Sequence, residues 1–458
     1  MLRSAEQLRT DALAIWRAGV DAVRSDRLVR DYVQVKGSWL RIGEDLLELR
    51  DIRRLVVFGA GKAGAGMAAG LEEAIGPEVA AAKQLTGWIN VPAGCVRPLN
   101  HIHLHAARPA GINEPTAAGV EGATRILQLA ESLGPNDVAI CLLSGGGSAL
   151  LPAPVAGVSL EDKQQLTRFL SAAGANIAEL NAVRKRLSRI KGGGLARACR
   201  AGQLYTLILS DVLGDPLDVI ASGPTTPDTA SLAEVAAVLE RFRVREANVA
   251  PSAIRYLDRL IATRPAAEPF PTEHVFNAVL GNNATAVDGA GIEAERRGYS
   301  HAMLAARELE GSAEDVARKH AEMALRMRSE SGPDCLITGG EPTVTLAPPD
   351  IRGRGGRNQH LVLAAANALG LERWHGLCIL SGGTDGEDGP TDAAGAFCDA
   401  GIAAAARASG LQAEDFLRRT DSYSFFEQVG GLIRTGPTHT NVCDVRVVVV
   451  DRIAGPHG

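Results

Sequence analysis

The sequence predicts an α/β protein of two domains, each built on a mostly parallel sheet flanked by helices. Short apolar runs end repeatedly in glycine-rich turns that lead into helical patterns, and this alternation is typical of parallel sheets covered by helices. The length of 458 residues exceeds what one core usually holds, since a domain averages roughly 150 residues. With 46% apolar and 22% charged residues, the chain has the composition of a globular protein.

The first predicted element is a helix near the N-terminus, where apolar residues recur with helical spacing. Leu8, Leu13, Ile15, Val20 and Val23 form this pattern, which is typical of an amphipathic helix. The predicted strands follow as short apolar runs, and all but the last lead into a turn. They cover residues 55–58, 85–91, 138–143, 204–209, 275–280, 335–338, 377–380 and 445–450.

Two proline-rich stretches indicate where the chain leaves regular structure. Residues 264–271 read RPAAEPFP, and their three prolines without periodicity predict an exposed linker. We therefore expect an N-terminal Rossmann-like domain at 1–263 and a C-terminal domain at 272–458. Residues 347–356 are rich in Pro, Gly and Arg and predict a mobile loop that leads into a helix.

Composition excludes several classes of protein. A formal net charge of −5 argues against a dedicated nucleic-acid binder, which is usually basic. The 7 cysteines are dispersed and form no CxxC pair, so we expect no zinc knuckle and a reducing compartment. Charged residues interrupt the N-terminus, and no run of about 18 uncharged apolar residues occurs. We expect a cytoplasmic protein without a membrane or nucleic-acid partner, with a homodimer left open.

The first glycine cluster, GAGKAG at 59–64, follows a predicted strand and opens a helix. It matches the GxGxxG dinucleotide fingerprint, which also requires an acidic residue about 20 positions later. The next predicted strand ends in Pro92 without such an acid. Lys62 stands within the turn, where it would meet a phosphate or a carboxylate. The alternative is a surface lysine at a helix N-terminus, which the helix dipole disfavours.

The second cluster is the turn Ser144-Gly145-Gly146-Gly147-Ser148. Consecutive glycines expose backbone N–H groups, which makes the turn either an oxyanion cradle or a tight structural turn. The basic run RKRLSRIK at 184–191 is most often a solvated helix face. Its alternative is a basic wall near phosphates, for which Lys191 is the best candidate.

Acidic residues follow the later strands. Asp211 stands at a strand tip, where it would hold Mg²⁺ or a substrate hydroxyl. In the second half, Glu341 follows a Gly-Gly turn, and Arg357 opens a predicted helix in the motif GGRNQ. A cation at a helix start is unfavourable unless it faces an anion, and arginine suits bidentate capture of phosphate or carboxylate. We expect His439 to be a hydrogen-bonded loop residue.

Taken together, these segments resemble the MOFRL-type glycerate 2-kinases, also called class II glycerate kinases. The matching stretches lie in the family's order from about residue 55 to residue 450. They are GAGKAGAGMA, LLSGGGSALLPAP, LNAVRKRLSRIKGGGLA, LILSDVLGDPLDVIASGPTTPD, ITGGEPTV, GRGGRNQHLVLAAA, LSGGTDGEDGPTDAAGAFCD and GPTHTNVCD.

The resemblance implies an enzyme with a C-terminal MOFRL domain that uses Mg²⁺ and transfers the γ-phosphoryl group of ATP to D-glycerate, giving 2-phosphoglycerate. It implies that Lys62 and Arg357 are catalytic cations, which we expect to converge on one anionic centre from separate domains. The acid of the SDV motif maps onto Asp211, which is also the expected metal ligand. Further expected substrate or nucleotide contacts are Gly61, Ser144, Gly145, Gly146, Ser148, Lys191, Glu341, Asn358, Asp385 and Asn441.

One segment departs from the family. Members commonly carry an HPVPD-like stretch in the first domain, whereas residues 107–115 here read ARPAGINEP. This difference leaves the substrate contacts of that loop open, and the alternative is a subgroup with a different acceptor or position of phosphorylation. Two rival functions remain: a hydroxypyruvate reductase that uses the GxGxxG turn for NAD, and a sensor of glycerate or nucleotide without catalysis.

Overall fold

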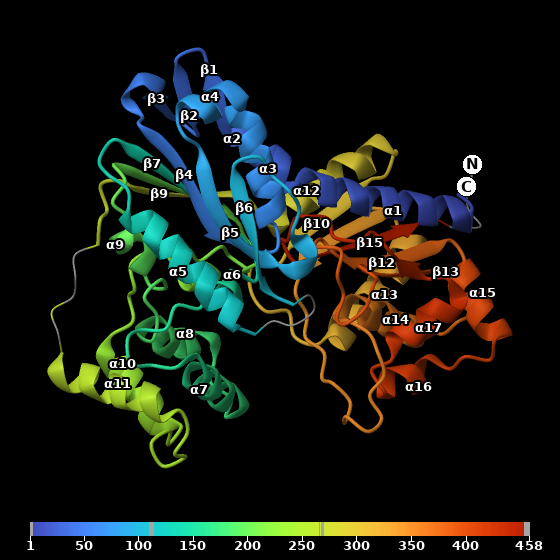
Figure 1. Ribbon diagram of the computed structural model, residues 1–458. Helices are drawn as coiled ribbons and strands as arrows, with labels where there is room; N and C mark the ends of the chain where they lie inside the picture. Colours follow the sequence, from blue (N-terminus) through green and yellow to red (C-terminus); the bar gives the residue numbers. More distant parts are fainter. Residues whose placement is uncertain (1–2, 110–113, 265, 267–269, 453–458) are drawn as a thin grey trace. The chain divides into compact units, whose positions relative to one another are not determined.

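The computed structural model describes residues 3–109, 114–264, 266 and 270–452 (Figure 1). The chain forms two compact units. One, here the central unit, comprises Ser25–Leu280, and the other comprises Met1–Arg24 and Gly281–Gly458. The second is called the terminal unit because it contains both chain ends. The sequence places the domain boundary at 264–271 instead; residues 265 and 267–269 of this expected linker lie outside the described residues.

The central unit is built on a six-stranded sheet in the order β6-β5-β4-β7-β8-β9. The registers of β4 with β5 and β7, of β5 with β6, and of β7 with β8 are all parallel. This arrangement confirms the parallel sheet expected in the first half of the chain. The strands are β4 (Arg54–Ala60), β5 (Thr86–Pro92), β6 (Ile102–Arg108), β7 (Asp137–Leu143), β8 (Gln203–Leu209) and β9 (Val275–Gly281).

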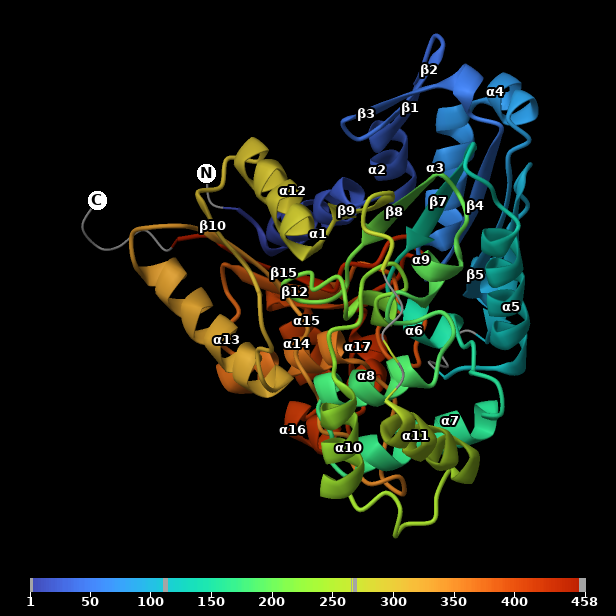
Figure 2. The same ribbon diagram turned by 90° about the vertical axis from the view of Figure 1, so that its left-hand side faces the viewer.

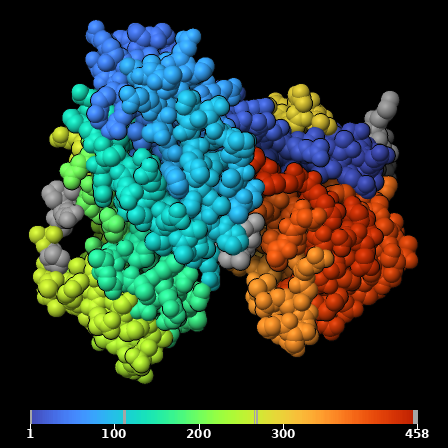
Figure 3. All heavy atoms as spheres, in the orientation of Figure 1, coloured from blue at the N-terminus to red at the C-terminus, as the bar shows by residue number. Residues whose placement is uncertain are grey.

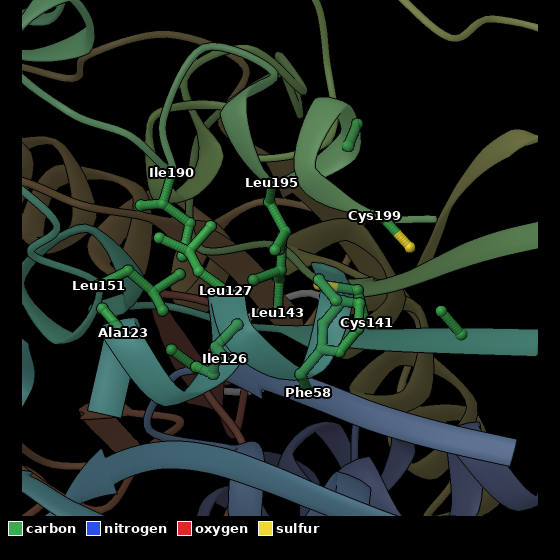
Figure 4. Close-up of a cluster of buried hydrophobic side chains, with 14 of the residues drawn as sticks. Phe58, Ala123, Ile126, Leu127, Cys141, Leu143, Leu151, Ile190, Leu195 and Cys199 are labelled. Carbon is green, nitrogen blue, oxygen red and sulfur yellow. The ribbon is translucent and has the colours of Figure 1, made fainter. Parts of the chain in front are cut away.

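Helices cover both faces of this sheet, which explains why its strands are near-continuous apolar runs. All seven residues of β7, DVAICLL, are buried. On one face, Phe58 and Cys141 pack with Ile126 and Leu127 of α5 (Ala117–Glu131) in the main core cluster (Figure 4). In the space-filling view, the teal segment that contains α5 lies on the surface of the central unit that faces the viewer (Figure 3). The other face carries α3 (Gly64–Ile75), whose first residue lies against Ile89 of β5.

Helices beyond the sheet form a second core of their own. Figures 1 and 2 both show α7, α8, α10 and α11 gathered in one cluster, and their apolar side chains pack together. Their bounds are α7 (Leu160–Ala172), α8 (Ile177–Arg186), α10 (Leu232–Arg241) and α11 (Pro251–Thr263). The remaining elements of the unit are α2 (Ser25–Tyr32), the antiparallel strands β1 (Val33–Lys36), β2 (Trp39–Ile42) and β3 (Asp45–Glu48), the helices α4 (Pro77–Ala82), α6 (Gly147–Leu150) and α9 (Gly194–Ala198), and the 3₁₀ turns η1 (Leu49–Asp51), η2 (Ala93–Cys95) and η3 (Ile220–Ser222).

The terminal unit has a mixed six-stranded sheet in the order β10-β11-β15-β12-β13-β14. Only β10 and β11 pair in parallel, and the four other pairings are antiparallel. The expectation of a second mostly parallel sheet was therefore wrong. The strands are β10 (His301–Ala305), β11 (Cys335–Gly340), β12 (Leu377–Gly383), β13 (Gly395–Asp399), β14 (Leu432–Ile433) and β15 (Asp444–Val450).

The reason for the error lies in β15, the apolar run at 445–450. It inserts between β11 and β12 and runs opposite to both. Burial on both faces makes a strand apolar whatever its direction, so the run itself carries no directional signal. Around the sheet lie α1 (Ala5–Ala22), α12 (Asn283–Arg296), α13 (Ala313–Ser329), α14 (Arg357–Leu369), α15 (Ala400–Ala408), α16 (Ala413–Arg418) and α17 (Ser422–Val429).

The N-terminal amphipathic helix is confirmed as α1, and its burial explains the spacing of its apolar residues. Leu8, Ala12, Ile15 and Trp16 are buried, and the Trp16 indole donates to the carbonyl of Gly382 at 3.1 Å. All eight predicted strands occur. The strands that were not predicted are short or interrupted by polar residues. They are β1–β3, β6, β10, β13 and β14. Among the residues that the structure describes, no helix has the length and apolar character needed to span a membrane.

Candidate active site

The turns after β4 and β7 lie side by side at the carboxyl edge of the central sheet. The Lys62 amide donates to the Gly145 carbonyl at 3.0 Å, and the Ser144 amide donates to Ala60 at 3.1 Å. The Ser144 hydroxyl accepts from the amide of Ala63 at 2.9 Å. A Cβ atom at Gly61 would lie 2.0 Å from that hydroxyl, so only glycine allows this approach. The backbone of Lys62 is thereby fixed, and Ser144 joins the two turns.

Gly146 has a left-handed backbone with φ +76° and faces two cations. A Cβ atom there would lie 3.3 Å from Nη2 of Arg108 and 3.7 Å from Cγ of Lys62. Arg108, the last residue of β6, is 4% exposed. Arg108 was not among the site residues predicted from the sequence, although it is the second residue of the segment 107–115 that departs from the family pattern. Residues 110–113 of that segment lie outside the described residues.

A second group of cations surrounds Ser148, three residues beyond Gly145. The Ser148 hydroxyl accepts from Nη2 of Arg184 at 2.5 Å and from Nζ of Lys191 at 2.5 Å. Lys191 also donates to the Ser148 carbonyl at 2.8 Å and to the Ser222 hydroxyl at 3.3 Å. Lys185 and Lys191 are buried, so the solvated-face interpretation of residues 184–191 is wrong for them.

Burial and mutual repulsion dominate the electrostatics of this group. Desolvation lowers the pKa of Lys191 well below its ordinary value, and the charges of Arg184, Lys163 and Lys185 lower it further. Desolvation, assisted by Arg184, lowers the pKa of Lys163 to about 7. Such shifts are frequent where a protein binds or transforms a charged ligand.

Asp211 follows β8 and therefore stands at the same edge of the sheet as the turns of Lys62 and Ser144. The preceding Ser210 hydroxyl bonds within the turn, donating to the carbonyl of Val212 at 3.2 Å. The described residues contain no group of three His, Cys, Asp or Glu side chains placed to hold a metal ion. A metal bound at Asp211 would need most of its ligands from a substrate or from water.

In the terminal unit, Arg357 is the first residue of α14. Its Nε and Nη2 donate to the two oxygens of Asp444 at 2.6 and 3.1 Å, and its Nη1 donates to Glu341 at 2.5 Å. Asp444 opens β15, opposite Gly340 of β11 and Gly383 of β12. The antiparallel insertion of β15 therefore places its first residue where the neighbouring strands end, and this brings Arg357, Asp444 and Glu341 together.

Asp388 is the second buried carboxylate beside this arginine. It accepts from the amides of Asn358 at 3.0 Å and Gln359 at 2.8 Å, and Asn358 Nδ2 donates to Asp444 at 2.9 Å. Burial raises the pKa of Asp388 to about 7, although these amides act in the opposite direction. Burial alone would lower the pKa of Arg357, but Asp444 and Glu341 raise it above its usual value.

Asp385 and Asn441 come from two loops that are tied together. Asp385 accepts the amide of Glu387 at 3.0 Å, and its carbonyl accepts the amide of Thr438 at 3.3 Å. The loop that contains Asn441 is held by Thr384, which donates to Cys443 at 2.7 Å. The central unit thus collects Gly61, Lys62, Ser144, Gly145, Gly146, Ser148, Lys191 and Asp211, and the terminal unit collects Glu341, Arg357, Asn358, Asp385 and Asn441.

Comparisons with known proteins agree with this two-part architecture. A family described as a domain of unknown function, DUF4147, matches residues 11–258, and the MOFRL family matches residues 334–444. A glycerate kinase of Rattus norvegicus is 35% identical, with 98% of this chain and 94% of the relative aligned. A D-glycerate 2-kinase of Thermotoga maritima is 33% identical over 97% of this chain and 99% of its own length. These matches define a two-domain protein of the DUF4147–MOFRL class.

The fold comparison extends the match to a solved structure. The crystal structure of a glycerate kinase from Thermotoga maritima superposes with a TM-score of 0.80 and 33% identity, covering 97% of this chain and all of that one. A protein of Agrobacterium vitis with the provisional name of hydroxypyruvate reductase is 38% identical over 87% of this chain and 99% of its own length. The chain belongs to the glycerate kinase family.

Proposed function

We propose that this chain transfers the γ-phosphoryl group of ATP to D-glycerate, giving 2-phosphoglycerate and ADP. The observation that carries the proposal is similarity over nearly the whole chain to glycerate kinases, including a D-glycerate 2-kinase. This chain also carries the motifs by which it resembles the family: the lysine of GAGK is Lys62, and the arginine of GGRNQ is Arg357.

Lys62 and Arg357 would act by electrostatic stabilisation. Phosphoryl transfer requires positioning and charge neutralisation more than covalent chemistry by the protein. The backbone of Lys62 is fixed by the turn of Gly145, so its side chain starts from a defined position at the carboxyl edge of the central sheet. Asp444 holds one edge of the Arg357 guanidinium through two hydrogen bonds. Glu341 holds the other edge with a side chain that is 42% exposed, and an incoming phosphate or carboxylate could replace it.

Asp211 would orient the acceptor hydroxyl or hold Mg²⁺. Mg²⁺ is usually bound through one or two carboxylates together with substrate phosphates and water. A single carboxylate at a strand tip fits an ion that arrives with its nucleotide. When bound, the ion would supply positive charge to the phosphates, while Asp211 positions the reacting oxygen.

The rival activity is NAD-dependent reduction of hydroxypyruvate, which the name of the Agrobacterium vitis relative suggests. The GAGKAG turn does join β4 to α3, as a dinucleotide site requires. Against this, β5 ends at Pro92 without an acid, and Lys62 occupies the turn. Purified protein mixed with hydroxypyruvate and NADH should leave the NADH absorbance unchanged, and rapid loss would support the reductase.

The direct test is a coupled assay of ADP release with D-glycerate and ATP, followed by NMR of the product. We expect turnover that depends on D-glycerate and a phosphate on carbon 2. Product phosphorylated on carbon 3 would overturn the assigned position. A folded protein without turnover would support the sensor interpretation.

A further inference from the structure

Three cationic side chains gather near Ser148: Arg184, Lys191 and Lys163. Arg184 lies in the last turn of α8, Lys191 lies in the segment that follows this helix, and Lys163 belongs to α7. Within the described part of the chain, their hydrogen bonds go to serine hydroxyls and backbone carbonyls. Lys163 donates to the carbonyl of Leu187 at 3.2 Å, and Lys191 and Arg184 converge on Ser148.

The neighbouring Lys185 is a buried lysine of the same region whose charge is neutralised by carboxylates. It is 6% exposed, and its ammonium lies 3.2 Å from Asp218 and 3.7 Å from Asp228. In the described residues no carboxylate forms an ion pair with Arg184, Lys163 or Lys191. Burying charges without counter-charges is costly, and proteins usually avoid it unless a ligand supplies the opposite charge.

The hydrogen bonds around Ser148 have a defined direction. Because the Ser148 oxygen accepts from two cations, its own proton is directed to the Ser222 oxygen at 3.0 Å. Ser222 in turn donates to Oδ1 of Asn181 at 3.2 Å. This series of hydrogen bonds directs the serine protons away from the cations and leaves the oxygen lone pairs facing them. Arg184 uses only one Nη2 bond within the described residues, so most of its N–H groups remain to bind a ligand.

We propose that Arg184, Lys191 and Lys163 form the binding site for the non-transferred phosphates of the nucleotide. The inference rests on the proposed kinase function and assigns the nucleotide to this side of the central unit. Three cations without a carboxylate suit a ligand with several negative charges. A carboxylate such as that of glycerate carries one charge and needs one such partner. The turn at 144–148 connects this cluster to Gly146, which faces Lys62, so one polyphosphate could be bound along a single turn.

The test compares Arg184→Gln with Arg184→Lys and with Arg245→Gln. Arg245 is an exposed arginine of the same unit that pairs with Asp258, so its variant controls for the loss of one positive charge. Calorimetry measures the Kd of ADP without glycerate, and steady-state kinetics measure KM for ATP and for D-glycerate. Circular dichroism verifies that each variant is folded.

We expect Arg184→Gln to weaken ADP binding by at least about 10-fold, consistent with loss of a charge-assisted hydrogen bond. KM for ATP should rise while KM for D-glycerate stays the same. Arg184→Lys should recover part of the affinity, and Arg245→Gln should bind ADP as the natural protein does. Inorganic pyrophosphate should compete with ADP in the natural protein.

Three outcomes would overturn the inference. A rise only in KM for D-glycerate would assign the cluster to the substrate carboxylate. Unchanged ADP binding in folded Arg184→Gln would make the cluster structural. Equal weakening in Arg245→Gln would indicate a general charge effect. Loss of ADP binding in Arg184→Gln would support the nucleotide site even if glycerate were not phosphorylated, so failure of the kinase proposal is distinguishable.

Discussion

The two units surround the cations of their candidate sites with opposite kinds of groups. Arg357 in the terminal unit is surrounded by Asp444, Glu341 and Asp388, and hydrogen bonds with the first two fix its guanidinium without any ligand. Arg184 and Lys191 in the central unit are surrounded by hydroxyls and carbonyls, and burial, together with repulsion from Arg184, lowers the pKa of Lys191. The first arrangement supports the fold by itself, whereas the second gains a counter-charge only with a ligand. Substitutions should therefore affect stability in the terminal unit and ligand binding in the central unit.

The largest effect is expected for Arg357→Ala. It removes a proposed catalytic charge and leaves two buried carboxylates without their cation. Breaking a fully buried pair costs about 3–5 kcal/mol of unfolding free energy. Because the Arg357 side chain is 34% exposed, we expect a loss of about 3 kcal/mol or less, and activity should fall by at least about 1000-fold. Thermal or urea unfolding and the ADP-release assay measure the two losses.

A double substitution separates these losses. Arg357→Ala with Asp444→Asn should recover part of the stability, because one uncompensated charge is removed, but none of the activity. Recovery of activity would remove Arg357 from the mechanism. An unchanged unfolding midpoint in the single variant would contradict the contrast between the units.

Lys62→Ala should affect activity alone. The backbone of the turn, held by hydrogen bonds with Gly145 and Ser144, fixes the position of this residue in the fold and does not depend on its side chain. We expect turnover to fall about 100- to 1000-fold, with the unfolding free energy changed by less than about 1 kcal/mol. Near-normal kcat would exclude Lys62 from catalysis, and Lys62→Arg tests whether charge alone suffices.

Asp388→Asn should change how stability depends on pH. The pKa of Asp388 is about 7 in the fold, which is above its value in the unfolded chain. The contribution of Asp388 to stability is therefore fully present below about pH 4, and it is lost as the pH rises from there through about 7. The unfolding free energy of the natural protein, relative to the variant, should fall by up to about 1.4 kcal/mol per pH unit in that window. Urea unfolding from pH 4 to pH 8 gives the difference, and a constant difference would contradict the raised pKa.

The sequence predicted the parts of this molecule that depend on local patterns. The parallel strands of the central unit were predictable because apolar runs such as 138–143 are buried throughout. Lys62 and Arg357 each lie in a glycine-rich turn that a family motif identifies, and their catalytic roles stay predictions. The direction of β15 was not predictable, since a strand buried on both faces has the same composition in either direction.

The partners of these residues escaped prediction for a related reason. Asp444 is 87 positions from Arg357 in the chain, and only the insertion of β15 brings them together. Arg184 lies 36 positions from Ser148, within a basic run that usually marks a solvated surface. The stretches NVCD and GEDG contained Asp444 and Asp388, but nothing in either stretch indicates which carboxylate is buried.

The smallest effect is expected for Ser148→Ala, which tests whether the cations of the central unit gain stabilisation from a ligand. Ser148→Ala removes the hydroxyl that accepts from Arg184 and Lys191, while both cations remain. The unfolding free energy should fall by about 1–3 kcal/mol because these donors lose a partner. Saturating ADP should restore part of it, since phosphate oxygens would accept the same hydrogen bonds and a ligand that binds only the folded state stabilises it. Melting curves without and with ADP measure the loss of stability and its recovery. Ser132→Ala, at an exposed serine of the same unit, is the control. If ADP stabilised Ser148→Ala less than it stabilised the natural protein, the serine itself would be a phosphate ligand and not only a partner of the two cations.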